Sequence, residues 1–122
     1  MGDGYPLIPA DLPAQFRAAM RRLAASVSIV VAQGDEGPVG IAATSITSLT
    51  ADPPAVLVSV NRTTSLHALL VPTAPLSINL LARDQSDVAA AFGGGLPRER
   101  RFSVGSWTEG LNALPSLAGA QA

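Results

Sequence analysis

The sequence has no cysteine, no lysine and a single histidine among its 122 residues, and each absence excludes a kind of chemistry. Without cysteine there is no disulfide framework, no thiolate nucleophile and no zinc–thiolate site. With His67 alone, neither a first-row metal site nor a Ser–His–acid triad is expected, and no Gly-x-Ser-x-Gly motif occurs. No spaced pair of Asp or Glu suits glycoside hydrolysis. We therefore predict no catalytic side chain and no metal ligand; if the protein is an enzyme, a cofactor carries the reaction.

Charged residues and long apolar runs are also scarce. The formal net charge is −1 and only 14% of the residues are charged, so nothing favours nucleic acid or an anionic membrane as a partner. No run approaches the ~18 consecutive apolar residues of a membrane span, and the N-terminus lacks the basic and apolar parts of a signal peptide. We expect a cytoplasmic protein.

The hydrophobic content is sufficient for one folded domain. Hydrophobic residues make up 48% of the chain, and a chain of this length buries roughly two thirds of its unfolded surface. Residues 1–10 contain Gly and Pro without periodicity and are expected to form a flexible arm. Residues 11–122 are expected to form the domain.

The stretch over residues 40–60 is the centre of the predicted fold. Ile41 and Leu49 point to one face of a strand and Ile46 to the other, which predicts a bend or bulge near residues 44–45. A bent strand of Ala, Thr and Ser exposes backbone amides and hydroxyls that can receive a planar polar ring. The alternative is an ordinary meander with a solvent-facing row of Ser and Thr, and these residues alone favour it.

The remaining elements follow from hydrophobic periodicity and turn residues. In chain order we first expect an amphipathic helix from Asp11 that covers one end of a sheet, a strand over 27–32 and a turn over 33–38. A bent strand from Val39 follows, and then a central strand over 55–60 that is buried on both faces. The last expected elements are a capped helix over 66–71, a strand over 76–80 and a helix capped by Asp84. Short connections make the first three strands an antiparallel meander. No clear strand is expected after residue 103.

Two polar features need partners. The start of the helix predicted near Thr64 and Ser65, with Arg62 beside it, can hold a phosphate, although a capped helix without a ligand explains the same residues. Asn79 lies in the middle of a predicted strand and requires hydrogen bonds if it is buried. By contrast, the glycines at 93–95 match no nucleotide-binding motif and predict a flexible loop.

The order of short segments along the chain is more informative than any single motif. These segments are Phe16-Arg17, Ala24–Val27, Gly40–Ser48, Asp52-Pro53-Pro54, Val60-Asn61-Arg62 with Ser65 and His67, Leu76–Leu81, Phe92, Arg101-Phe102, Trp107 and Gly110. Their order and spacing resemble the flavin reductase-like family, FMN-binding proteins that include reductase components of two-component monooxygenases. The resemblance implies a mainly β fold with short α-helices, an antiparallel split β-barrel that here lacks the family's C-terminal strands.

The resemblance implies contacts to the isoalloxazine ring of the flavin. Ala43, Thr44 and Ser45 would contact the ring through backbone amides and hydroxyls. Thr47 and Asn61 would lie beside it.

It also implies contacts to the rest of the nucleotide. Arg62, Thr64 and Ser65 would hold the phosphate, and Asn79 would reach the ribityl chain or the pyrimidine. His67 would lie near the phosphate or pack on its helix.

The reaction implied is hydride transfer from NADH or NADPH to N5 of FMN, with FAD as the alternative flavin. Arg101 and Phe102 would border the nicotinamide pocket. The implied partners are a second copy in a homodimer and a flavin-dependent monooxygenase that receives the reduced flavin. Two alternatives remain: a flavin-binding protein without reductase activity, and an interaction module that binds no cofactor.

Overall fold

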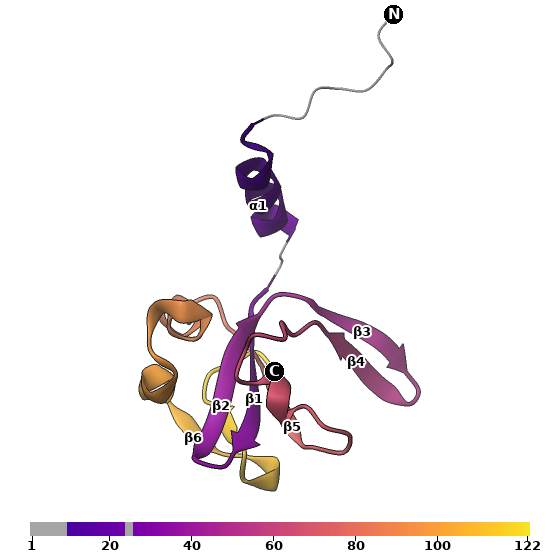
Figure 1. Cartoon of the computed structure of the whole chain (residues 1–122). Coiled ribbons are helices and arrows are strands. Elements are labelled where there is room, and N and C mark those ends of the chain that lie inside the picture. The colour runs from indigo at the N-terminus through magenta and orange to yellow at the C-terminus, as the bar shows by residue number, and fades with distance from the viewer. Residues whose placement is uncertain (1–9, 24–25) are drawn as a thin grey trace, which may run out of the picture.

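The computed structural model describes residues 10–23 and 26–122, so the predicted arm lies outside the described residues except for Ala10. The helical elements are α1 (Leu12–Leu23), η1 (His67–Leu69), α2 (Ser86–Ala90), η2 (Ala91–Gly95), η3 (Arg98–Ser103) and η4 (Leu111–Ala113). The strands are β1 (Ser28–Gly34), β2 (Gly37–Ala43), β3 (Ile46–Ala51), β4 (Pro54–Val58), β5 (Leu76–Leu80), β6 (Trp107–Glu109) and β7 (Pro115–Leu117). The strands pair as β2-β1-β5, β3-β4 and β6-β7, and every recorded pairing is antiparallel. The predicted mainly β fold with short helices is confirmed (Figure 1).

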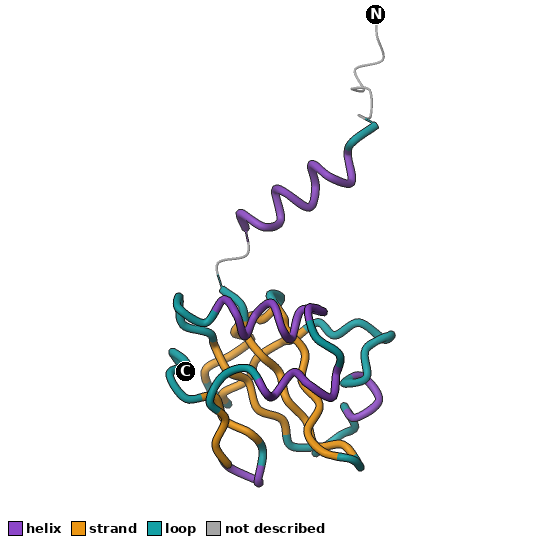
Figure 2. Tube along the Cα trace, turned by 90° about the vertical axis from the view of Figure 1, so that its left-hand side faces the viewer, coloured by secondary structure: helices purple, strands orange, loops and turns teal. Residues whose placement is uncertain are grey.

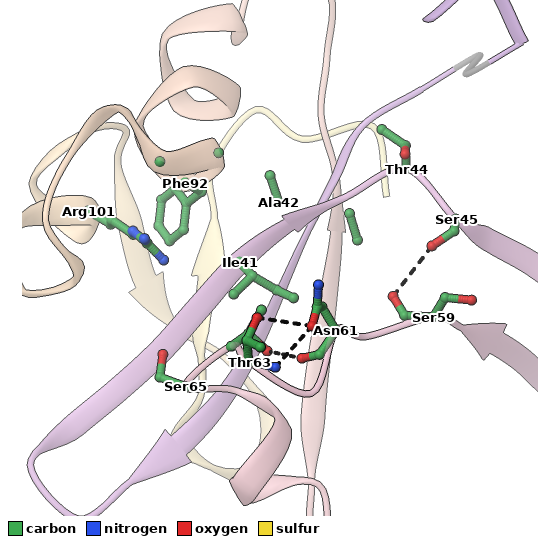
Figure 3. A pocket seen from close by; sticks show the side chains of 14 residues that line it. Ile41, Ala42, Thr44, Ser45, Ser59, Asn61, Thr63, Ser65, Phe92 and Arg101 are labelled. Atoms are coloured by element: carbon green, nitrogen blue, oxygen red, sulfur yellow. Dashed lines mark hydrogen bonds between the residues drawn. The ribbon is translucent and has the colours of Figure 1, made fainter. Parts of the chain in front are cut away.

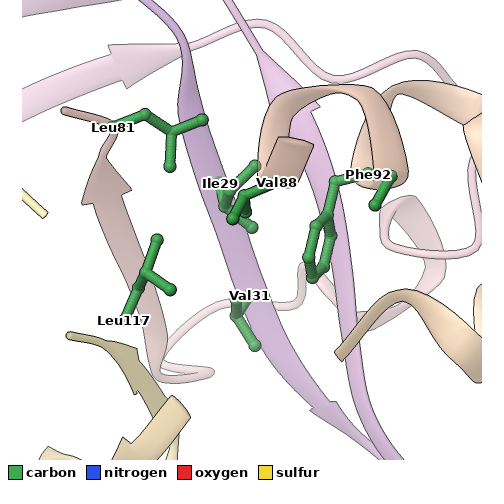
Figure 4. Close-up of a cluster of buried hydrophobic side chains, with 7 residues drawn as sticks. Ile29, Val31, Leu81, Val88, Phe92 and Leu117 are labelled. Atoms are coloured by element: carbon green, nitrogen blue, oxygen red, sulfur yellow. The ribbon is translucent and has the colours of Figure 1, made fainter. Parts of the chain in front are cut away.

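Strand β1 is the centre of the fold, because apolar layers cover both of its faces. Ile29 and Val31 point into a cluster with Val88 and Phe92 of the helical segment and Leu117 of β7 (Figure 4). Val30 and Ala32 point to the opposite side and contact a second cluster that includes Ala43 and the fully buried Leu66. Because side chains alternate along a strand, one apolar run supplies both clusters.

The predicted burial of residues 55–60 is wrong. Residues 55–58 belong to β4 and residues 59–60 follow it; among the described strands, β4 pairs with β3 alone in a two-stranded ribbon. Val56 and Leu57 are 52% and 57% exposed, and as neighbouring residues of a strand they point to opposite faces. Both faces of the β3–β4 ribbon are therefore open at these positions in the single chain, and Leu49 of β3 is 64% exposed as well, whereas Ile46 and Val58 pack against the cluster around Leu66.

The predicted bend at residues 44–45 is confirmed. β2 ends at Ala43, whose partner in β1 is Ser28, and β3 begins at Ile46, whose partner in β4 is Val58. The predicted meander thus exists, but the chain passes from one sheet to another at the bend. A second irregularity shifts the β3–β4 register between Ser48 and Thr50.

Helix α1 is present but does not cover the sheet as predicted. It projects from the body of the domain in both views (Figures 1 and 2), and Phe16 is 60% exposed. The apolar stripe of the helix is therefore unpartnered over the side chains that are described, residues 12–19. Val27, predicted to begin the first strand, directly precedes β1 and packs against the cluster around Ile29.

The predicted caps of the two short helices are wrong. The helix expected over 66–71 is the short η1, and no side chain caps it. At α2 the N-cap position is Gln85 rather than Asp84, and it also makes no side-chain cap. Instead, Gln85 accepts a hydrogen bond from the backbone N–H of Ala82 (2.9 Å) and donates one to the carbonyl of Ala118 (2.9 Å). Gln85 therefore ties this helix to the C-terminal segment.

The hairpin β6–β7 was not predicted, because its strands have three residues each. Trp107 holds it to the core through the rings of Phe92 and Phe102, at centroid distances of 5.5 and 5.0 Å. The same two Phe rings meet edge to face at 5.0 Å. This aromatic cluster fixes η2 and η3 beside β2.

Gly40 of β2 lies directly against this cluster. A Cβ at Gly40 would lie 2.7 Å from a ring carbon of Phe92, whereas a Cβ at Gly93 would meet nothing within 4 Å. We predict that Gly40→Ala lowers the free energy of unfolding by about 1–3 kcal/mol, because the packed ring cannot move away. The matched variant Gly93→Ala should stay within about 0.5 kcal/mol of the parent. Urea denaturation measures both, and equal stability of the two variants would contradict the described packing.

Candidate functional site

A pocket of about 550 Å³ lies beside β2, a volume within the range of small-molecule sites. Four segments line it: the end of β2 with the 44–45 bend, the loop after β4, the turn η2, and η3 (Figure 3). Its lining residues are Ile41, Ala42, Ala43, Thr44, Ser45, Ser59, Asn61, Thr63, Thr64, Ser65, Phe92, Gly93, Gly94 and Arg101.

The β2 side of the pocket consists of Ile41, the small side chains of Ala42 and Ala43, and backbone. β2 is an edge strand in the order β2-β1-β5, so alternate N–H and C=O groups on its outer side have no strand partner. Ala42 and Ala43 leave that backbone accessible, and the chain then bends at Thr44 and Ser45, which are exposed. Ser45 secures the bend, since its backbone carbonyl accepts from the N–H of Ser59 (3.2 Å).

The loop over residues 61–65 is organised by Asn61. The side-chain oxygen of Asn61 accepts from the backbone N–H (3.0 Å) and the hydroxyl (2.9 Å) of Thr63, and its main-chain carbonyl accepts from the Thr64 hydroxyl (2.8 Å). Both threonine hydroxyl protons are therefore used within the loop. The Ser65 hydroxyl makes no hydrogen bond to another described residue, so it is free to donate to a ligand in the pocket.

The opposite wall comes from the helical segment. Arg101 of η3 donates from Nη1 to the carbonyl of Gly40 (3.0 Å) and from Nε to the carbonyl of Leu96 (3.3 Å). It thereby fastens η3 to β2 with a half-buried guanidinium group. Gly93 and Gly94, predicted only as a flexible loop, line the pocket beside Phe92, and the positive φ of Gly94 (107°) suits glycine.

The structure brings seven of the twelve predicted cofactor-binding residues to this pocket. They are Ala43, Thr44, Ser45, Asn61, Thr64, Ser65 and Arg101. The other five, Thr47, Arg62, His67, Asn79 and Phe102, do not line it. Phe102 packs in the aromatic cluster instead, and the side chains of Thr47, Arg62 and His67 are exposed.

Asn79 departs most clearly from its predicted place. Its Nδ2 donates to the carbonyl of Ile29 (3.3 Å) and to the Ser77 hydroxyl (3.2 Å), and its Oδ1 accepts from the N–H of Leu117 (3.0 Å). The side chain is buried and joins β5 to β1 and β7. The hydrogen-bonding requirement was predicted correctly, but the protein itself satisfies it.

Other kinds of site find no support in the described part of the chain. Within residues 10–23 and 26–122, no three His, Cys, Asp or Glu side chains gather closely enough to hold a metal ion. None of the helices described there has the length and hydrophobicity that crossing a bilayer requires.

Comparison with known proteins identifies, along most of the chain, the family that the order of its sequence segments resembles. Residues 20–122 match the model of the flavin reductase like domain. The FMN reductase (NADH) RutF of Stutzerimonas stutzeri is 40% identical over 105 residues, covering 86% of this chain and 60% of the relative. The 4-hydroxyphenylacetate 3-monooxygenase reductase component of Pseudomonas aeruginosa is 38% identical over 109 residues, covering 88% and 64%. The chain thus spans less than two thirds of the length of these relatives.

Solved structures agree with this match. The NADH:FAD oxidoreductase SgcE6 of Streptomyces globisporus, in complex with NAD and FAD fragments, superposes with a TM-score of 0.77 at 26% identity, covering 95% of this chain and 69% of that one. The styrene monooxygenase flavin reductase of Pseudomonas putida S12 gives a TM-score of 0.70 at 29% identity, covering 87% and 67%. The fold described above is therefore that of flavin reductases.

We predict that Asn61 organises the 61–65 loop through its side-chain acceptor. Asn61→Ala removes the acceptor for two Thr63 donors and should lower the free energy of unfolding by about 1 kcal/mol. Asn61→Asp keeps the acceptor and should preserve most of that stability. Thermal denaturation and amide hydrogen exchange at Thr63 measure the effect; unchanged protection in Asn61→Ala would contradict it.

Proposed function

Because the chain belongs to the flavin reductase-like family, we propose that it is an NADH-dependent FMN reductase whose flavin site is the pocket beside β2. The nicotinamide would give a hydride to N5 of the flavin, and the reduced flavin would be released to a partner. The residues of this chain would bind and align the two reactants, since alignment at contact distance is the main contribution this site can make. NADPH in place of NADH and FAD in place of FMN are the alternatives.

The observation that carries the proposal is the meeting of the 44–45 bend and the 61–65 loop in one pocket. An isoalloxazine ring is flat, polar at one edge and apolar at the other, so it needs a surface without bulky side chains. Ala42 and Ala43 provide that surface, and Thr44 and Ser45 add hydroxyls and amides at its end. Asn61 would lie beside the ring.

The phosphate end of the flavin would lie at the 61–65 loop. Ser65 offers its uncommitted hydroxyl, and Thr64 lines the pocket next to it. Arg101 lines the opposite wall and adds positive charge to a pocket that contains no carboxylate. An anion is therefore the ligand that the charges of this pocket favour.

The names of the relatives support a partner for this protein. Relatives named as reductase components of monooxygenases support a flavin-dependent monooxygenase as the acceptor of the reduced flavin. We propose residues 11–122 as the flavin reductase domain of a cytoplasmic protein, with no nucleic-acid or membrane partner.

The activity is tested by following the near-ultraviolet absorbance of NADH with purified protein and FMN. Oxidation of NADH that depends on both FMN and protein is the expected result. An FMN complex that forms without NADH oxidation would identify a flavin-binding protein that lacks reductase activity. Absence of an FMN complex would overturn the proposal.

The phosphate contact is tested with Ser65→Asp. We predict that this carboxylate weakens FMN binding at least about tenfold by repelling the phosphate, while riboflavin, which has no phosphate, binds nearly as before. Ser106→Asp introduces the same charge on an exposed residue outside the pocket and should leave both ligands unaffected. Flavin fluorescence titration gives the dissociation constants, and equal losses for FMN and riboflavin would contradict the proposed contact.

We also propose a homodimer in which a second copy covers the β3–β4 ribbon. Three large apolar side chains, Leu49, Val56 and Leu57, are more than half exposed on this ribbon. Large apolar side chains exposed on both faces of a ribbon are unfavourable in water, and association buries them.

The dimer proposal is tested with Leu57→Glu. We predict that this change shifts the protein from dimer to monomer in sizing chromatography with light scattering, because it places a charge in the buried interface. Leu111→Glu is the matched control, since Leu111 is 90% exposed on η4, outside the ribbon. A parent protein that elutes as a monomer would overturn the proposal.

A further inference from the structure

A second cavity, also of about 550 Å³, adjoins the phosphate end of the proposed flavin pocket. It lies between the β1–β2 hairpin turn and η3, and Leu69 also lines it. Ser65 lines both cavities, so it marks the boundary between them. In Figure 3, Ser65 lies on the side of the pocket toward the β1–β2 turn.

The two cavities differ in charge. The first contains Arg101 and no carboxylate. The second is lined by three carboxylates, Asp35, Glu36 and Glu99, against the single positive charge of Arg98. Crossing the boundary at Ser65 therefore takes an anion from a positive to a negative environment.

FMN and FAD respond differently to this boundary. FMN ends at its phosphate, whereas FAD continues from the same phosphate into a second phosphate and an adenosine. With the first phosphate at Ser65 and the ring and ribityl chain in the first pocket, the adenylate part would extend into the second cavity, which Ser65 also lines. The cavity has room for an adenosine, so shape does not exclude it. The second phosphate of FAD, however, carries its negative charge toward the three carboxylates.

We propose that Asp35, Glu36 and Glu99 make this protein selective for FMN over FAD by electrostatic repulsion. The inference rests on the proposed function, because it takes the flavin phosphate to lie at Ser65. These carboxylates are specificity-determining residues that touch neither the ring nor the nicotinamide. The discrimination is electrostatic and acts between exposed groups, so salt weakens it.

The test uses charge-neutral variants of nearly equal shape. Asp35→Asn, Glu36→Gln and Glu99→Gln are made singly and together, and Asn in the hairpin turn keeps a residue that turns favour. Glu109→Gln is the control, because Glu109 is an exposed carboxylate that lines neither cavity. Circular dichroism confirms that the variants fold, and fluorescence titration gives dissociation constants for FMN and FAD at low and high salt.

The expected parent preference for FMN at low salt is about tenfold, from a few carboxylate–phosphate repulsions across solvent. In the triple variant FAD should bind about threefold to tenfold more tightly, while FMN changes by less than about twofold. High salt should reduce the preference of the parent but not that of the triple variant, and Glu109→Gln should match the parent.

The outcomes separate this inference from the function it rests on. Failure of the parent to bind FMN at all overturns the proposed function. Tight FMN binding with equal FAD affinity, or a preference that the triple variant or salt does not change, overturns the role of the carboxylates and leaves the reductase proposal standing.

Discussion

Burial of β1 on both faces is the constraint on which the rest of this structure depends. Its four apolar residues, 29–32, are almost completely inaccessible to water, and they divide equally between the two hydrophobic clusters. The helical segment α2–η2 packs on one face and Leu66 on the other. With β5 paired to one side of β1, β2 occupies the other side and becomes the edge of the sheet. The open backbone edge beside the pocket is thus a consequence of how the core is built.

The pocket is held together by contacts between segments distant in sequence. Arg101 joins η3 to Gly40, 61 residues earlier in the chain, and Phe92 packs against the same glycine. On the other side, Ser45 and Ser59 join the bend to the loop that Asn61 shapes. These contacts fix the walls before any ligand is present, which lowers the entropy cost of binding. A site of this kind can align two planar reactants without contributing an acid, a base or a nucleophile of its own.

Local sequence patterns predicted local backbone features well. They predicted poorly which strands are buried by other elements of the fold. The change of face between Ile41 and Ile46 correctly predicted the bend, because side-chain alternation is a local property. The apolar runs at 29–32 and 55–60 look alike in sequence, yet only the first is buried, because coverage depends on elements far along the chain. Asn79 shows the same limit: its need for partners was evident, but two of its three partners lie 50 and 38 residues away. For the site, the residues near the bend and the 61–65 loop were predicted, whereas Gly93 and Gly94 were missed because a glycine has no side chain to reveal a lining role.

The central claim is that the 44–45 bend and the 61–65 loop bind opposite ends of one flavin nucleotide. Titration of the isotope-labelled protein with FMN, followed through backbone amide NMR signals, tests it most directly. The account predicts that the amides of Thr44, Ser45, Thr64 and Ser65 shift together with one dissociation constant, while that of Glu109 does not move. Shifts confined to one of the two segments, or different constants for the two, would contradict it.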